Sequence, residues 1–150
     1  MYKSILVATD GSTLAAEAVR QAILLAKAIA AKLTVIHAMP SSEAFVNERY
    51  NVLPALAAPV KEKYKEEFAA ASKKILDDAC AQGTAAGVDC TRVSVTSASP
   101  YEAIIKQAAK SKCDLIMMAS HGRRGVDSVL IGSETQKVLT HSKIPVLVVR

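Results

Sequence analysis

Aromatic residues are scarce in this sequence of 150 residues, which has no tryptophan, two phenylalanines and four tyrosines. Nevertheless, 51% of the residues are hydrophobic, so the core has to be built from aliphatic side chains and alanine. A chain of this length is large enough for one domain with a core of its own. We therefore expect a single domain over residues 1–150.

Long hydrophobic runs are also missing, since none approaches the roughly 18–20 residues that a membrane-spanning helix needs. The start of the chain, Met1 to Ser4, leads at once into an apolar stretch and lacks the profile of a signal peptide. Cysteine is rare, and Cys80, Cys90 and Cys113 are an odd number without metal-ligand spacing. These absences predict a reduced, cytoplasmic protein that has no membrane segment.

Motifs of known catalytic chemistry are absent as well. The sequence has no Gly-x-x-x-x-Gly-Lys-Ser/Thr phosphate loop and no Gly-x-Ser-x-Gly nucleophile elbow. Its histidines, at positions 37, 121 and 141, form no metal-ligand motif, and no residue stands out as a general base. The formal charge of +5 raises nucleic acid as a partner, but lysines alternate with acids over residues 61–67 and no aromatics interleave with them. A binding module that does not contact nucleic acid is favoured.

Extended and helical patterns alternate along the chain, which is typical of βα units and a parallel sheet. Apolar residues recur at helical spacing from Leu14 to Ile29 and from Val60 to Ala79. Polar and apolar residues alternate over 91–96, so this strand is expected at a sheet edge. The five expected strands are 5–8, 33–38, 91–96, 114–119 and 145–149.

Residues 40–58 show neither period and contain two prolines. They predict an irregular loop or flap, with a short irregular helix or a partner-contact segment as the alternatives. Helix starts are clearer, because Ser12 is a suitable N-cap and Ser99 and Ser133 each begin a capping-box pattern. Each of those patterns has an acidic or amide residue three positions after the serine.

The most informative stretch is Ala119-Ser120-His121-Gly122, followed after nine residues by Gly132-Ser133. It follows an apolar strand pattern and leads into a helix pattern over 134–141. Glycine allows close approach of the backbone, and the free N–H groups at a helix start attract anions. Arg123 and Arg124 add positive charge, unless these side chains simply extend into solvent. The segment predicts a site for a small phosphorylated ligand.

The chain resembles the universal stress protein family, whose nucleotide-binding members carry Gly-x-x-Gly, nine residues, then Gly-Ser or Gly-Thr. Gly122, Gly132 and Ser133 match this motif, and Ala119 stands at the first glycine position. If Ala119 has a positive φ, its Cβ costs on the order of 1 kcal/mol of strain. If its φ is negative, the added methyl group has only a minor steric effect beside the ribose. The resemblance extends to residues 5–12, 35–38 and 144–149. It implies an open, five-stranded, Rossmann-like α/β sheet of order 3-2-1-4-5, with helices on both faces.

The resemblance also implies an ATP or AMP site where the strand order switches. Asp10 accepts a hydrogen bond from ribose or adenine there, or else only stabilises the turn before Gly11. Ala8, Thr9 and Ala38 line the adenine pocket, which Met118 joins unless it is simply core. We expect Mg at the site only where ATP carries it. The loop and helix start around the phosphates comprise Ala119, Ser120, His121, Gly122, Arg123, Arg124, Gly125, Gly132, Ser133, Glu134 and Thr135.

Three functions fit the sequence: a nucleotide-binding module of the stress response, a nucleotide-independent dimeric interaction protein, and a slow ATPase or phosphotransferase. The slow ATPase or phosphotransferase would use His121 or Ser133. Whichever function applies, the negative charge of Glu134 would repel a bound polyphosphate. Residues 146–149 are an apolar strand at the chain end, and an exposed edge of this kind tends to pair. We therefore expect a homodimer that forms through this strand, as the resemblance also implies.

Overall fold

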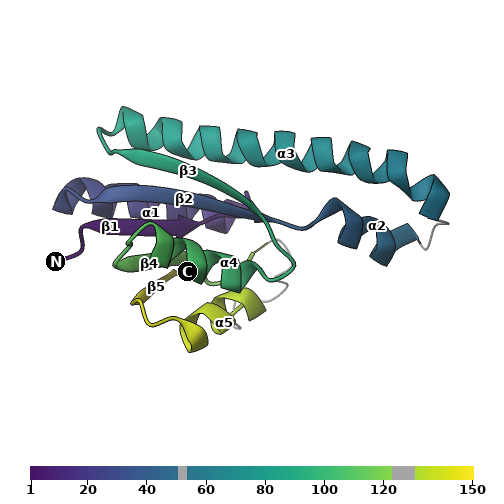
Figure 1. The fold of residues 1–150 in the computed structure, drawn as a ribbon. Coiled ribbons are helices and arrows are strands. Elements are labelled where there is room, and N and C mark those ends of the chain that lie inside the picture. Colours follow the sequence, from purple (N-terminus) through teal and green to yellow (C-terminus); the bar gives the residue numbers. More distant parts are fainter. Residues whose placement is uncertain (51–53, 123–130) are drawn as a thin grey trace.

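The computed structural model describes residues 1–50, 54–122 and 131–150. Strands and helices alternate through most of this α/β domain, with a second helix between β2 and β3 (Figure 1). The elements are β1 (Ser4–Ala8), α1 (Thr13–Ile29), β2 (Lys32–Met39), α2 (Ser42–Tyr50), α3 (Pro54–Ala85), β3 (Cys90–Thr96), α4 (Pro100–Lys110), β4 (Leu115–Ala119), α5 (Ser133–His141) and β5 (Val146–Val149). None of the described helices is long and apolar enough to cross a membrane.

All five strands form one parallel sheet in the order β3-β2-β1-β4-β5, which confirms the predicted order. β1 is the central strand and pairs with both β2 and β4. The alternating pattern of β3 correctly predicts an edge strand, and β5 forms the opposite edge. The strand order therefore reverses between β1 and β4, where open sheets bind their ligands.

Helices cover both faces of the sheet, and each face has its own core. Ile5 and Val7 of β1 pack with α1 and α3 on one face, while Leu6 packs with α4 and α5 on the other. Side chains of a strand point alternately to its two faces, so a strand covered on both sides has to be apolar throughout. This explains why the β1 sequence shows no polar alternation.

The prediction of an irregular loop or flap over residues 40–58 is wrong for most of this segment. α2 and the start of α3 occupy it, and α3 runs past the carboxyl ends of the strands to meet α2 (Figure 1). Phe45 of α2 packs on Tyr64 and Phe68 of α3, with ring centroids 4.9 and 5.2 Å apart, and Val46 is fully buried. The helical period is weak in sequence because α2 packs against a single helix rather than against the sheet.

Two helices end in a left-handed residue that is not glycine. Ala30 after α1 has φ 54° and Lys112 after α4 has φ 52°. In each case the residue that follows it hydrogen-bonds back into the last turn: Ala31 N donates to Ala26 O, and Cys113 N donates to Ala108 O. These are Schellman ends, in which glycine is the usual left-handed residue.

The prediction that Ser12 caps α1 is confirmed, since its Oγ accepts from Ala15 N at 3.2 Å. The two predicted capping boxes are wrong. Ser99 precedes α4 without a side-chain capping bond, and Ser133 is the first residue of α5 rather than its cap, which is Gly132. A tertiary contact described below replaces the local bond at α4.

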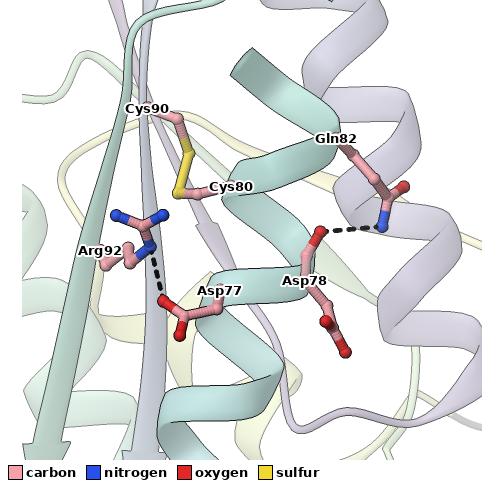
Figure 2. The surroundings of a disulfide bond; sticks show 6 residues. All are labelled: Asp77, Asp78, Cys80, Gln82, Cys90 and Arg92. Atoms are coloured by element: carbon pink, nitrogen blue, oxygen red, sulfur yellow. Dashed lines mark hydrogen bonds and ion pairs between the residues drawn. A yellow bond between two sulfur atoms is a disulfide. The ribbon is translucent and has the colours of Figure 1, made fainter. Parts of the chain in front are cut away.

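The prediction that the cysteines are reduced is also wrong, because Cys80 of α3 and Cys90 of β3 form a disulfide (Figure 2). α3 ends in a Schellman motif in which Gly87 has φ 79° and Val88 N donates to Gly83 O at 2.9 Å. This turn brings β3 back alongside the helix, so that the two cysteine Cα atoms lie 5.6 Å apart. Cys113 remains a free, buried thiol. The cytoplasmic location remains a prediction.

Candidate nucleotide-binding site

The ends of β1 and β4 lie side by side at the carboxyl edge of the sheet. After β1, Thr9 N donates to Ile36 O of β2, and the Asp10 carboxylate accepts from Ser12 N at 2.9 Å. Thr9 Oγ1 accepts from Gly11 N at 3.2 Å, and Gly11 has φ 76°. The turn-stabilising role of Asp10 is therefore present, through Oδ1 of its carboxylate.

The second oxygen of Asp10 faces the loop that follows β4. A Cβ added to Gly122 would overlap Asp10 Oδ2 and would lie 3.4 Å from Asp10 Cγ. Only a residue without a side chain fits at position 122 while the carboxylate keeps its place. The two segments that the sequence predicts as parts of one site are thus in direct contact across the switch point.

A second close approach ties the start of α5 to the same loop. A Cβ on Gly132 would lie 3.2 Å from His121 Cα and 3.4 Å from Ser120 O. Gly132 N donates to Ser120 O at 2.7 Å, and Ser120 N donates to Val149 O at 2.7 Å. The buried Ser120 hydroxyl lies 3.2 Å from His121 Nδ1. Gly132 therefore permits close backbone contact with residues 120 and 121, whereas Gly122 permits contact with the Asp10 side chain.

α5 begins without a side-chain cap. Gly132 at its N-cap has none to offer, so the side-chain oxygen that commonly accepts from the first amides of a helix is missing here. Thr135 is buried, and its Oγ1 donates to Ala119 O at 2.9 Å, which fixes the first turn of α5 to the end of β4. The amides of residues 133–135 are the donors that such a helix start offers to an anion.

The carboxylate of Glu134 contacts α4 and Lys137. Its Oε2 accepts from Tyr101 N in the first turn of α4 at 2.9 Å, and its Oε1 pairs with Lys137 Nζ at 2.9 Å. Hydrogen bonding to Glu134 raises the pKa of Lys137. The carboxylate therefore caps α4 from a neighbouring helix and is partly neutralised, which weakens the repulsion that it would exert on phosphate.

Comparison with known proteins decides the family. A model of the universal stress protein family matches residues 1–150. The chain belongs to the universal stress protein family. Universal stress protein MJ0531 of Methanocaldococcus jannaschii is 33% identical over 152 residues, which cover 100% of this chain and 83% of that protein.

Solved structures agree with this assignment. The hypothetical protein MJ0577 is 30% identical and superposes with a TM-score of 0.79, over 99% of this chain and 96% of that one. A universal stress protein in complex with cAMP is 28% identical and has a TM-score of 0.69, over 99% of this chain and 97% of that one. The Rossmann-like fold of the family is therefore the fold of this chain.

Within this universal stress protein, Ala119 lies at the end of β4, paired with Val149. Among the described residues other than glycine, Ala30 and Lys112 have positive φ, so Ala119 does not need the conformation that favours glycine. The strained alternative considered for Ala119 is thereby excluded. Its methyl group is buried in the core on the α1 face.

The remaining predicted residues divide between the site edge and the core. Ala8 and Ala38 lie at the ends of β1 and β2 and are partly exposed, and Thr9 is buried at the first position after β1. Met118 packs with Leu6 and Ile36 in the core beneath α4 and α5. Arg123, Arg124 and Gly125 lie outside the described residues. Within the described ranges, no group of three or more His, Cys, Asp and Glu side chains could hold a metal ion.

Proposed function

We propose that this universal stress protein is a binding module of the stress response that holds ATP or AMP at the carboxyl edge of its sheet. The observation that carries the proposal is the contact between Asp10 and Gly122 at the switch point between β1 and β4. It joins a carboxylate suited to ribose or adenine to a glycine loop suited to phosphate.

Each part of the nucleotide has candidate partners in the proposed site. Ala8, Thr9 and Ala38 border the adenine, and Asp10 accepts from a ribose hydroxyl or the adenine amine. Phosphate oxygens accept from the loop at Gly122 and from the amides of residues 133–135. His121, Arg123 and Arg124 supply further donors, and Mg enters only with ATP.

The related structure with cAMP supports an adenine ligand for this chain. Its likeness to the present structure extends over nearly the whole of both chains. The N–H groups at the start of α5 support binding of the phosphate portion, since no side chain caps them at Gly132. Binding without dedicated catalysis is proposed because the sequence contains no general base that would face the phosphates.

The direct test is made on protein purified without added nucleotide. The protein is denatured, and the supernatant is analysed for nucleotides by chromatography with mass detection. We expect near-stoichiometric AMP, ADP or ATP or, if the site is empty, saturable binding of added ATP by calorimetry, with GTP as the matched control. An empty protein that binds neither ATP nor AMP would contradict the proposal and favour a nucleotide-independent interaction protein.

We also propose that the protein forms a homodimer through β5. This strand is an edge of the sheet, Leu147 on it is 40% exposed, and Leu139 on the adjacent α5 is equally exposed. We expect a dimer in light scattering at micromolar concentration and a monomer for Leu147→Glu. Leu24→Glu, at a residue of α1 that is 50% exposed, is the control and should leave the dimer intact.

A further inference from the structure

We propose that the Cys80–Cys90 disulfide is a thiol-exchange site for anionic low-molecular-weight thiols, and that Cys90 Sγ is the sulfur they attack. This inference is independent of nucleotide binding. It rests on three properties of the α3–β3 contact: how the pair is held, which cysteine is accessible, and which charges lie beside it.

The fold holds the two cysteines together whether or not they are bonded. Gly83 is buried one turn after Cys80, and an added Cβ there would lie 3.4 Å from Cys90 Cβ and 3.6 Å from Cys90 Sγ. Gly83 thus lies directly against Cys90, and the last turns of α3 run close beside the start of β3. Since the Schellman end at Gly87 fixes the return of the chain, the reduced thiols remain positioned to form the bond again.

The two sulfurs differ in their surroundings. Cys80 is 1% exposed and is packed in the core between α1, α3 and the sheet. Cys90 is only partly buried, at the first position of the edge strand β3. Because exchange requires direct approach of a thiolate to one sulfur, access selects Cys90 as the sulfur attacked and Cys80 as the leaving group.

Positive charge lies on the same face of β3 as Cys90. Arg92 is two residues along β3 from Cys90 and therefore shares its face, and Figure 2 shows its guanidinium directed toward α3 beside the disulfide. Arg92 Nε lies 3.0 Å from Asp77 Oδ1, and Lys73 pairs with the same carboxylate. A groove of about 450 Å³ adjoins them and is lined by Ala69, Lys73, Leu76, Asp77, Arg92 and Ser94.

Two cations against one carboxylate leave this groove with a net positive charge. It therefore favours a thiol that carries carboxylates over a neutral or cationic thiol. The groove lies along the face of β3 that carries Cys90, and an anionic thiol drawn to Arg92 approaches Cys90 from this side.

The proposed step balances as an ordinary thiol–disulfide exchange. The thiolate of the small molecule attacks Cys90 Sγ, the bond to Cys80 breaks, and Cys80 leaves as a thiolate that takes a proton from water. A second thiolate then attacks the small-molecule sulfur of the mixed disulfide and releases Cys90. In total, the protein disulfide gains two electrons and two thiols are oxidised to their disulfide.

The test uses the folded, full-length protein with glutathione as the probe, alkylation as the quench and peptide mass mapping as the readout. We expect the mixed disulfide at Cys90 to exceed that at Cys80 by about tenfold or more. In Cys80→Ser, glutathione disulfide should modify Cys90, whereas in Cys90→Ser it should leave Cys80 unmodified until the protein is unfolded. Cys113, which is 6% exposed, is the internal control for local unfolding.

The choice of thiol tests the role of the groove. At equal thiolate concentration, glutathione should react faster than 2-mercaptoethanol and cysteamine, and Lys73→Gln should slow glutathione alone by roughly threefold. Lys74→Gln is the matched control, because Lys74 pairs with Asp78 and does not line the groove. Equal modification of both cysteines, a disulfide that is reduced only after unfolding, or equal rates for the three thiols would overturn the proposal.

Discussion

The carboxylate of Asp10 occupies the space that a side chain at position 122 would need. Asp10 Oδ1 is held by Ser12 N, so the carboxylate has little freedom to move aside when the loop after β4 changes. The glycine at position 122 is thus required by a neighbour from the other end of the sequence, 112 residues away in a chain of 150.

Gly122→Ala is expected to displace Asp10 and to weaken nucleotide binding. Because the added Cβ would overlap Asp10 Oδ2, the carboxylate has to move, and we expect ATP affinity to fall about tenfold or more, which corresponds to about 1.4 kcal/mol. Calorimetric titration with ATP measures the effect. Ala119→Gly is the control and should change affinity by less than about threefold, because Ala119 has no positive φ to relieve. Unchanged binding in Gly122→Ala would remove the Asp10 contact from the proposed site.

Thr135→Val should destabilise the protein and shift the start of α5. The substitution removes the donor to Ala119 O and leaves that buried carbonyl unpaired, at a loss of about 1–3 kcal/mol. Chemical denaturation measures the loss. Thr140→Val is the matched control, because the Thr140 hydroxyl bonds to Gln136 O within the same helix and is exposed, so a change below about 0.5 kcal/mol is expected. Equal losses in the two variants would show that the bond from Thr135 to Ala119 contributes no more to stability than the bond from Thr140 to Gln136.

Ala30→Gly should stabilise the protein, because Ala30 has φ 54° at the end of α1. Glycine adopts this conformation without the Cβ strain, so we expect a gain of about 0.5–1 kcal/mol in the free energy of unfolding. Ala28→Gly, two residues earlier inside the exposed part of the helix, should instead lower it by about 1 kcal/mol. Thermal unfolding should shift in opposite directions for the two variants, and a loss in both would contradict the left-handed conformation of Ala30.

Asp114→Asn tests a carboxylate that fixes the start of the sheet. Burial raises the pKa of Asp114, but the backbone N–H groups of Lys3 and Ser4 outweigh it and lower the pKa below its ordinary value. Because the folded-state pKa is the lower one, the stabilisation is complete above the unfolded pKa of about 4 and is lost as the pH falls through the folded pKa.

We therefore expect Asp114→Asn to lower stability at pH 7 by about 1 kcal/mol. The difference from the natural chain should shrink as the pH falls below about 4. Unfolding by urea between pH 2.5 and 7 measures it. Asp89→Asn is the charge control at an exposed position, and a similar pH-dependent loss in that variant would indicate a general charge effect rather than the bonds to Lys3 and Ser4.

The sheet was predictable from the sequence because its signal is local. Unbroken apolar runs mark buried strands such as β1, and alternation marks the edge strand β3. The cap of α4 was not predictable, since Tyr101 N bonds to Glu134, a residue 33 positions away. The Cys80–Cys90 bond was missed because its formation depends on the return turn at Gly87 rather than on a recognisable spacing.

Some parts of the candidate site could be predicted from the sequence and others could not. The glycine pattern predicts Gly122 and Gly132, and both lie at close contacts: Gly122 against the Asp10 carboxylate and Gly132 against the backbone of Ser120 and His121. The capping role of Ser133 is wrong because α5 begins one residue earlier than the capping pattern suggests, and the bond of Glu134 to α4 was not predicted. A boundary error of one residue turns an expected cap into a helical position and directs the next side chain to another helix.

The register of the sheet places the Cys80–Cys90 disulfide and the proposed nucleotide site at opposite ends of the strands. Cys90 is aligned with Leu33, which in turn is aligned with Ile5 in the first half of β1, whereas Asp10 lies two residues beyond the end of that strand. With about 3.3 Å per strand residue, roughly 16 Å of sheet separates the two levels. A small thiol joined to Cys90 would therefore sit clear of an arriving nucleotide, so that thiol exchange by mass and nucleotide binding by calorimetry can be measured independently on one preparation.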